Sequence, residues 1–287
     1  GRAQEYRHQS ASVGKAFTWA VLGLAADKLR LNVDEPVYRT WTGIGEFSHT
    51  HKHLDNEQHR NITWRHLAEH TAGFAVESGY HWRTQDIADA AWIREKWTGN
   101  PTYDMYSFRE PGARYYSSAG YVRLGQALTA LWGMDIKRVL DQELLGKIGI
   151  KAQNWHWMTL QEVYQEYAIY PAAPGYGHYV DPPYHIRGNV VRGGPGWVCM
   201  AAEDMARFGL LIATGGLWKG EQLLASEWLI SKSGGNESTL VGDRRHFIAG
   251  ARIATTSLPD FLWVPDFEEY CFPDYLIDPA VMPGNGS

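Results

Sequence analysis

The sequence has few of the features that mark a disulfide scaffold, a nucleic-acid-binding protein or a membrane protein. Only two of its 287 residues are cysteine, Cys199 and Cys271, so both a pair and two buried thiols stay open. Basic residues (27 Lys and Arg) are fewer than acidic ones (32 Asp and Glu), and no basic stripe points to nucleic acid. No apolar run is long enough to cross a bilayer. An ordinary globular composition remains, with 44% hydrophobic and 21% charged residues.

The most informative stretch is Ser12-x-x-Lys15, which precedes the almost wholly apolar run 17–24. A segment that is apolar all round predicts a buried helix, here over about residues 12–28. Ser12 would lie at the helix N-terminus, where free N–H groups and the helix dipole favour developing negative charge. Lys15 lies one turn later on the same face, and a buried amine gives up its proton more readily than one in water. The spacing predicts a nucleophile with a local base. A serine that only caps the helix, followed by a solvated lysine, would give the same sequence pattern.

Periodicity and end signals predict the remaining elements. Helices are expected at 64–69, 84–97, 119–132, 136–145 and 202–213. Thr63 and Asp135 are the candidate N-caps of two of them. Residues 154–189 are rich in aromatics, proline and glycine without clear periodicity, which predicts an irregular wall or lid over a site. Residues 246–254 resemble a strand, and 259–279 an irregular acidic and aromatic excursion.

Two further segments could contribute to a site. Tyr116 and Ser118 lie directly before a predicted helix, where a tyrosine can shuttle a proton to a leaving group or simply pack. Near the other end, Asn285-Gly286-Ser287 could bring main-chain N–H groups close to a substrate as part of an oxyanion hole. An ordinary turn would have the same composition.

A rival reading is a metal site. His49-x-His51-x-His53-x-Asp55 contains part of the His-x-His-x-Asp-His run of metallo-hydrolases. The residue after Asp55 is Asn56 rather than His, and no clear pattern supplies the remaining ligands. A solvated polar loop is the simpler interpretation.

Taken in order, five segments resemble landmarks of the serine β-lactamase and penicillin-binding-protein superfamily. The likeness is greatest to its class C-type serine hydrolase branch, which includes family VIII carboxylesterases and 6-aminohexanoate-dimer hydrolases. The segments are Ser12-Val13-Gly14-Lys15, 67–73 (LAEHTAG), 116–121 (YSSAGY), 193–208 and 218–224.

The resemblance implies an α/β (α+β) fold of the β-lactamase/transpeptidase type, with an antiparallel sheet flanked by helices and a mostly helical lobe. Residues 1–37 and 200–287 would form the sheet lobe with the nucleophile helix, and 38–199 the helical lobe with the aromatic-rich loop 154–189. Strands that relatives carry before the Ser-x-x-Lys helix and after the third motif are not evident here. Either those parts are missing or the sheet is built differently.

The resemblance also assigns roles. Ser12 would be the acylated nucleophile, Lys15 would activate it, and Tyr116 would act as general base and acid. Ser118 stands at the place of the motif's Asn. Gly284-Asn285-Gly286 would be the third motif, and the oxyanion hole would use the N–H groups of Ser12 and Ser287. No cofactor or metal is implied, the partner is a small ester or amide substrate, oligomers are compatible, and relatives are mostly periplasmic or secreted.

Two departures from the family pattern bear on the substrate. Ser118 replaces an amide that holds the substrate's amide side chain in β-lactamases, and Gly284 replaces a cation or imidazole that helps bind the β-lactam carboxylate. Losing a charged hydrogen bond of that kind costs about 1.5–3 kcal/mol. We therefore expect a carboxylesterase or amidase. The alternatives are a β-lactamase or D-Ala-D-Ala carboxypeptidase, and a non-catalytic penicillin-binding or sensor-type relative.

Overall fold

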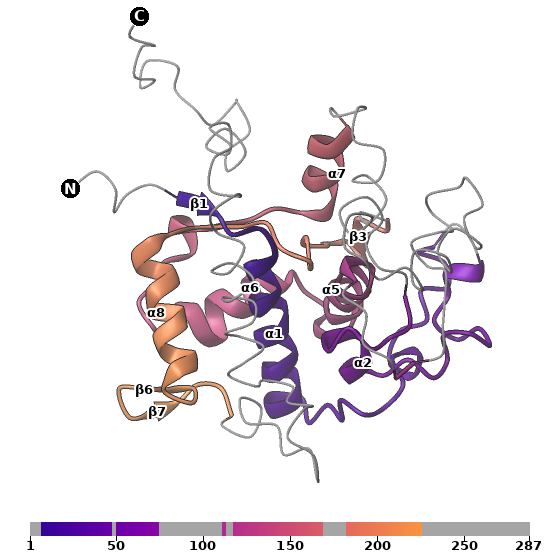
Figure 1. The fold of residues 1–287 in the computed structure, drawn as a ribbon, viewed down its shortest axis with the longest axis horizontal. Helices are drawn as coiled ribbons and strands as arrows, with labels where there is room; N and C mark the ends of the chain where they lie inside the picture. Colours follow the sequence, from indigo (N-terminus) through magenta and orange to yellow (C-terminus); the bar gives the residue numbers. More distant parts are fainter. Residues whose placement is uncertain (1–6, 48–49, 75–110, 113–116, 169–181, 226–287) are drawn as a thin grey trace, which may run out of the picture.

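The fold is organised around helix α1 (Lys15–Lys28), which lies in the middle of the molecule (Figure 1). The computed structural model describes residues 7–47, 50–74, 111–112, 117–168 and 182–225. Residues 17–25 of α1 are all buried, as the apolar run predicted, and the helix ends at the expected residue. The segments 84–97, 246–254 and 259–279, for which a helix, a strand and an excursion were expected, lie outside the described residues.

Helices cover α1 on two sides (Figure 1). Helices α5 (Ser118–Trp132) and α6 (Ile136–Leu140) pack against it, and α6 continues into a π-helical turn, η6 (Asp141–Leu145). Phe17 of α1 stacks on Phe208 of α8 (Ala202–Ala213), with ring centroids 4.3 Å apart. Phe17 also stacks on Trp155, at 6.0 Å. The core therefore lies between α1 and the elements that surround it.

A short antiparallel sheet lies at the N-terminal end of α1, with the strand order β1-β5-β2. Strand β5 (Val198–Ala201) pairs with β1 (Arg7–Gln9) on one edge and β2 (His156–Trp157) on the other. Its Cys199 is buried and opposite both Gln9 and His156. The candidate disulfide partner, Cys271, lies outside the described residues.

The remaining elements are short. They are η2 (Ala11–Gly14), η3 (Val37–Arg39), η4 (Thr50–Lys52), α2 (Trp64–Ala68), η7 (Ala152–Asn154), α7 (Leu160–Ala168), β3 (His185–Ile186), β4 (Asn189–Val190), β6 (Leu217–Trp218) and β7 (Glu221–Gln222). Strands β3 and β4 form one hairpin, and β6 and β7 another. Among the described residues, none of the helices combines the length and the apolar character that crossing a bilayer requires.

The predicted helix ends inside the described ranges are confirmed to within a few residues. The hydroxyl of Thr63 accepts from the N–H of His66 at the start of α2, and the carboxylate of Asp135 accepts from the N–H of Lys137 at the start of α6. The irregular structure expected over 154–189 is wrong for α7. Thr159 and Glu162 form a capping box that begins this helix, with N–O distances of 3.1 and 2.6 Å.

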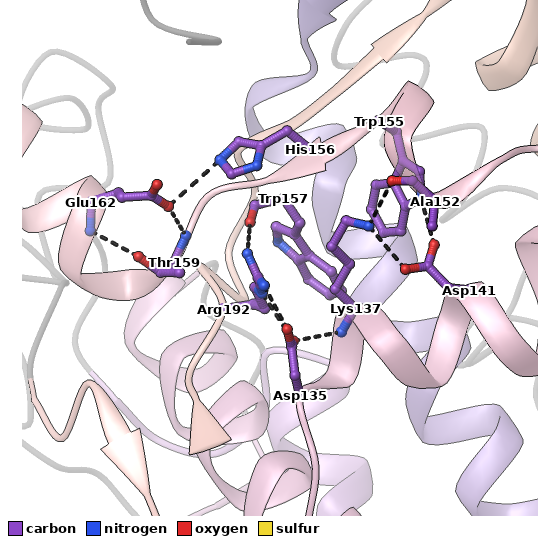
Figure 2. Close-up of polar contacts among 10 residues, drawn as sticks. All are labelled: Asp135, Lys137, Asp141, Ala152, Trp155, His156, Trp157, Thr159, Glu162 and Arg192. Atoms are coloured by element: carbon purple, nitrogen blue, oxygen red, sulfur yellow. Dashed lines mark hydrogen bonds and ion pairs between the residues drawn. The ribbon is translucent and has the colours of Figure 1, made fainter. Parts of the chain in front are cut away.

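Part-buried polar contacts connect β2, α6 and the chain around residue 192 (Figure 2). The guanidinium of Arg192 forms two parallel bonds to the carboxylate of Asp135, the N-cap of α6, and a third to the carbonyl of Trp157 in β2. Lys137 reaches Asp141 at 2.9 Å, and Asp141 accepts from the indole N–H of Trp155 at 2.7 Å. These bonds fix the chain just before residues 193–197, which matter for the site described next.

Candidate active site

Ser12 lies on the turn that joins the sheet to the buried helix. The N–H of Ser10 donates to the carbonyl of Val198 at 2.8 Å, which carries the β1–β5 pairing up to this turn. Ser12 itself is in η2 and α1 begins at Lys15, so the expected helix start lies three residues too early. The side chain of Ser12 is exposed, whereas that of Lys15 is buried. The hydroxyl of Ser12 is therefore accessible to a substrate, while the amine of Lys15 is shielded from solvent.

The side-chain nitrogen of Lys15 lies between two serine side chains. Its Nζ lies 3.3 Å from the Oγ of Ser12 and 3.3 Å from the Oγ of Ser118, and it donates to the carbonyl of Pro195 at 2.9 Å. The serine distances are at the long end of the hydrogen-bond range. Catalytic hydrogen bonds are often long before substrate binds and tighten in the complex. The structure thus gathers three of the predicted site residues, Ser12, Lys15 and Ser118, around one nitrogen.

Ser118 enters the site as the first residue of α5. Its side chain is 4% exposed, and its hydroxyl faces Lys15. The ring of Tyr121, one turn further along α5, faces the same nitrogen, with Nζ 5.6 Å from the ring centroid. The first turn of α5 therefore forms one wall of the lysine's surroundings.

The loop 193–197 forms the opposite wall. Besides the Pro195 carbonyl on Lys15, the carbonyl of Gly194 accepts from the hydroxyl of Thr18 at 2.7 Å. The indole N–H of Trp157 donates to the carbonyls of Gly193 and Gly196, at 3.1 and 2.9 Å. Sequence reasoning recognised this loop only as a family landmark. The contact between Lys15 and the carbonyl of Pro195 could not be predicted from the sequence, because every residue type carries a main-chain carbonyl.

Two glycines allow this loop to approach the helices. A Cβ on Gly14 would lie 2.7 Å from the main chain of Gly196, and one on Gly194 would lie 2.2 Å from the carbonyl oxygen of Tyr121. Real Cβ atoms do not approach backbone so closely, so any side chain here would force the loop away. The close approach of Gly196 therefore explains why the residue before Lys15 is a glycine.

Four other predicted site residues lie outside the described residues: Tyr116, Asn285, Gly286 and Ser287. Their roles in proton transfer and in the oxyanion hole stay predictions. The same holds for the roles of Ser12, Lys15 and Ser118, whose positions are described but whose chemistry is not.

His49 of the candidate metal run lies outside the described residues, whereas His53 and Asp55 lie in the described part of the chain. There, no three His, Cys, Asp or Glu side chains are placed to hold a metal ion. The carbonyl of His53 instead accepts from the amide of Asn56 at 2.7 Å, and the N–H of His59 donates to the same amide's oxygen at 2.9 Å. These are the bonds of a closed polar loop.

Comparison with known proteins settles the family. The family model described as Beta-lactamase matches residues 4–249. The chain belongs to the β-lactamase family. This confirms the superfamily of serine β-lactamases and penicillin-binding proteins that the motifs indicated, together with its fold. The match ends before residues 285–287. A search of curated proteins gives no match.

Solved structures with this fold are distant in sequence. A candidate 6-aminohexanoate-dimer hydrolase from Bacillus anthracis is 18% identical with a TM-score of 0.51, covering 79% of this β-lactamase-family chain and 53% of that one. A candidate β-lactamase from Bacteroides dorei is 17% identical, with a TM-score of 0.49 and coverages of 78% and 55%. A penicillin-binding protein from Bacillus halodurans is 16% identical, with a TM-score of 0.48 and coverages of 82% and 68%. The chain spans about half of the length of several of the structures it matches.

Proposed function

We propose that this β-lactamase-family protein is a serine hydrolase that forms an acyl-enzyme on Ser12 and hydrolyses small ester or amide bonds. One observation carries the proposal. An exposed serine hydroxyl lies 3.3 Å from a buried lysine amine, at the N-terminal end of a buried helix. Nucleophile and base within reach of each other are the minimum that covalent acyl transfer requires.

The proposed reaction has two steps. Lys15 takes the hydroxyl proton of Ser12 as Oγ attacks the substrate carbonyl carbon, and the C=O bond opens to an oxyanion. The N–H of Ser12 and the positive end of α1 favour that charge. The oxyanion collapses, the C–O or C–N bond breaks, and the proton passes to the leaving alcohol or amine, for which Tyr116 is the proposed relay. Water then attacks the acyl-enzyme, releases the acid and restores Ser12.

The proposed substrate preference rests on Ser118. Its hydroxyl is shorter than the amide that stands at this place in β-lactamases, and it faces Lys15. An amide side chain on a substrate would lose its usual partner there. This favours simple esters and amides over β-lactams. The resemblance that supports this reading also favours a periplasmic or secreted location.

The deciding experiment is covalent labelling. We expect a fluorophosphonate probe to add once to the wild-type chain in an intact-mass measurement, and not at all to Ser12→Ala. Ser10→Ala is the matched control, since Ser10 lies two residues away on the same turn and should leave labelling unchanged. An adduct that persists in Ser12→Ala would refute the assignment of the nucleophile.

Two substrates then separate the alternatives. Turnover of a small p-nitrophenyl ester without turnover of a chromogenic cephalosporin supports the esterase or amidase. The reverse preference indicates a β-lactamase or carboxypeptidase. A stable adduct with penicillin that is never released indicates a penicillin-binding or sensor-type relative.

A further inference from the structure

The end of helix α2 contains a histidine where a glycine is expected. The N–H of Thr71 donates to the carbonyl of His66 at 3.0 Å, which closes the helix in a Schellman-type turn. His70 is the residue inside this turn, with φ +62°. Glycine is the usual residue there because any Cβ is strained in the left-handed region. A side chain kept in a strained backbone position points to a use for that side chain.

The ring of His70 meets the main chain at the start of α5. The N–H of Ser117 donates to Nδ1 of His70 at 3.1 Å, and the carbonyl of Ser117 lies 3.2 Å from the same nitrogen. Ser117 is the N-cap of α5, but its own side chain makes no capping bond in the described structure. Nδ1 accepts from this N–H in the tautomer that carries its proton on Nε2, and it donates to the carbonyl of Ser117 in the other tautomer.

A second contact strengthens the same junction. The ring of His70 lies on the ring of Tyr121, with centroids 5.0 Å apart. The phenol of Tyr121 donates to the carbonyl of Ala68, the last residue of α2, at 2.9 Å. The end of α2 therefore holds the first turn of α5 both through the main chain and through a side chain.

We propose that His70 is a positioning residue that sets the first turn of α5, and with it Ser118, against Lys15. Ser117 is covalently joined to Ser118, whose Oγ is 3.3 Å from Nζ of Lys15. In these contacts His70 meets the main chain of Ser117 and the ring of Tyr121 rather than Ser12 or Lys15, so it acts on the site through the first turn of α5. The expected effect of His70 on the reactivity of Ser12 rests on the proposed function. Its effect on the position of the first turn of α5 does not.

Two substitutions at this position separate its roles. His70→Gly keeps the left-handed turn and relieves its strain but removes the acceptor. His70→Asn places a carboxamide oxygen near the position of Nδ1, and asparagine tolerates the left-handed region. We expect fluorophosphonate labelling of Ser12 to slow by about tenfold or more in His70→Gly, since a shift of about 1 Å at a catalytic site can cost about a hundredfold. His70→Asn should stay within about threefold of wild type.

Stability and main-chain order provide readouts independent of activity. His70→Gly should unfold thermally at the wild-type temperature or above it, because glycine is favoured at the end of a helix. Backbone hydrogen exchange over residues 117–121 should be faster in His70→Gly than in wild type and His70→Asn. Lys219→Gly is the matched control. It removes a side chain at φ +49° in the β6–β7 turn and should change neither labelling nor this exchange.

The outcomes are distinct. Slower labelling and faster exchange in His70→Gly, both rescued in His70→Asn, support the positioning role. Unchanged exchange in His70→Gly overturns it, as does an equal loss of labelling in both variants. A wild-type chain that never labels refutes the proposed function alone, and the exchange comparison still decides the role of His70.

Discussion

Lys15 and Ser118 are 103 positions apart in the chain, yet Nζ and Oγ lie 3.3 Å apart in the buried interior between α1 and α5. The family pattern assigns the position of Ser118 to substrate binding. In this molecule its hydroxyl is directed at the lysine that also contacts Ser12. Changes at residue 118 should therefore act on the reactivity of the nucleophile as well as on the choice of substrate.

The first prediction concerns the hydroxyl of Ser118. Ser118→Ala should lower kcat/KM for a small ester by about fivefold, because one net hydrogen bond contributes about 1 kcal/mol and each 1.4 kcal/mol changes a rate tenfold. Ser118→Asn restores the amide of the relatives and should raise the ratio of cephalosporin to ester turnover. Steady-state kinetics with both substrates measures the two effects. An ester kcat/KM unchanged in Ser118→Ala would contradict the prediction.

The second prediction concerns the close approach at Gly14. Gly14→Ala places a Cβ 2.7 Å from the main chain of Gly196, so the loop must move, at a cost of about 1–3 kcal/mol in the free energy of unfolding. Labelling of Ser12 should slow as well, since Pro195 moves with this loop. Gly209→Ala is the control: its Cβ would meet nothing within 4 Å on helix α8, and stability should rise by about 0.5–1 kcal/mol. Denaturant unfolding of both variants gives the comparison.

The third prediction concerns the paired bonds between Arg192 and Asp135 (Figure 2). Arg192→Lys keeps the charge but cannot make both parallel bonds, so we expect the free energy of unfolding to fall by about 1–3 kcal/mol. Arg207→Lys is the control on helix α8, where the ion pair with Glu203 is more exposed. That change should stay within about 1 kcal/mol. Equal losses in the two variants would refute a special role for Arg192.

The fourth prediction concerns pH and Glu162 in the α7 capping box. Burial opposes ionisation of this carboxyl, but bonds from His156 and from the N–H of Thr159 outweigh it and lower its pKa from 4.5 to about 2. A carboxyl with a lowered folded-state pKa stabilises the fold above its unfolded pKa. This contribution is lost as pH falls from 4.5 towards 2, because the unfolded chain takes up the proton first.

Glu162→Gln isolates that contribution. Glutamine can still complete the capping box but carries no charge. We expect wild type to exceed the variant in unfolding free energy by about 1 kcal/mol at pH 6, since solvent screens this partly exposed group. The gap should narrow as pH falls below 4.5 and close near pH 2. Urea unfolding at several pH values measures the difference, and a gap independent of pH would show that the charge does not matter.

Local sequence signals were sufficient to predict α1, α2 and α6. The apolar run after Lys15 predicted α1, and Thr63 and Asp135 predicted the starts of α2 and α6, because capping and periodicity act over a few neighbouring residues. The same reasoning missed the start of α7. Its capping box was present in the sequence, but the surrounding aromatic residues obscured the periodicity. Trp155 and Trp157, expected in a loop over a site, are buried in the core.

The sequence by itself determined the pairing of Ser12 with Lys15, because a spacing of three aligns two side chains on one face of a helical turn, here the 3₁₀ turn η2 that leads into α1. It also indicated the β-lactamase family through the order of its motifs. Only the tertiary structure decided that Ser118 and the carbonyl of Pro195 meet the same lysine, and that His70 holds the main chain of Ser117. These contacts join segments far apart in the chain, and two of them use main-chain atoms that every residue type carries. The packing of the whole chain determines these contacts, and no local sequence pattern predicts them.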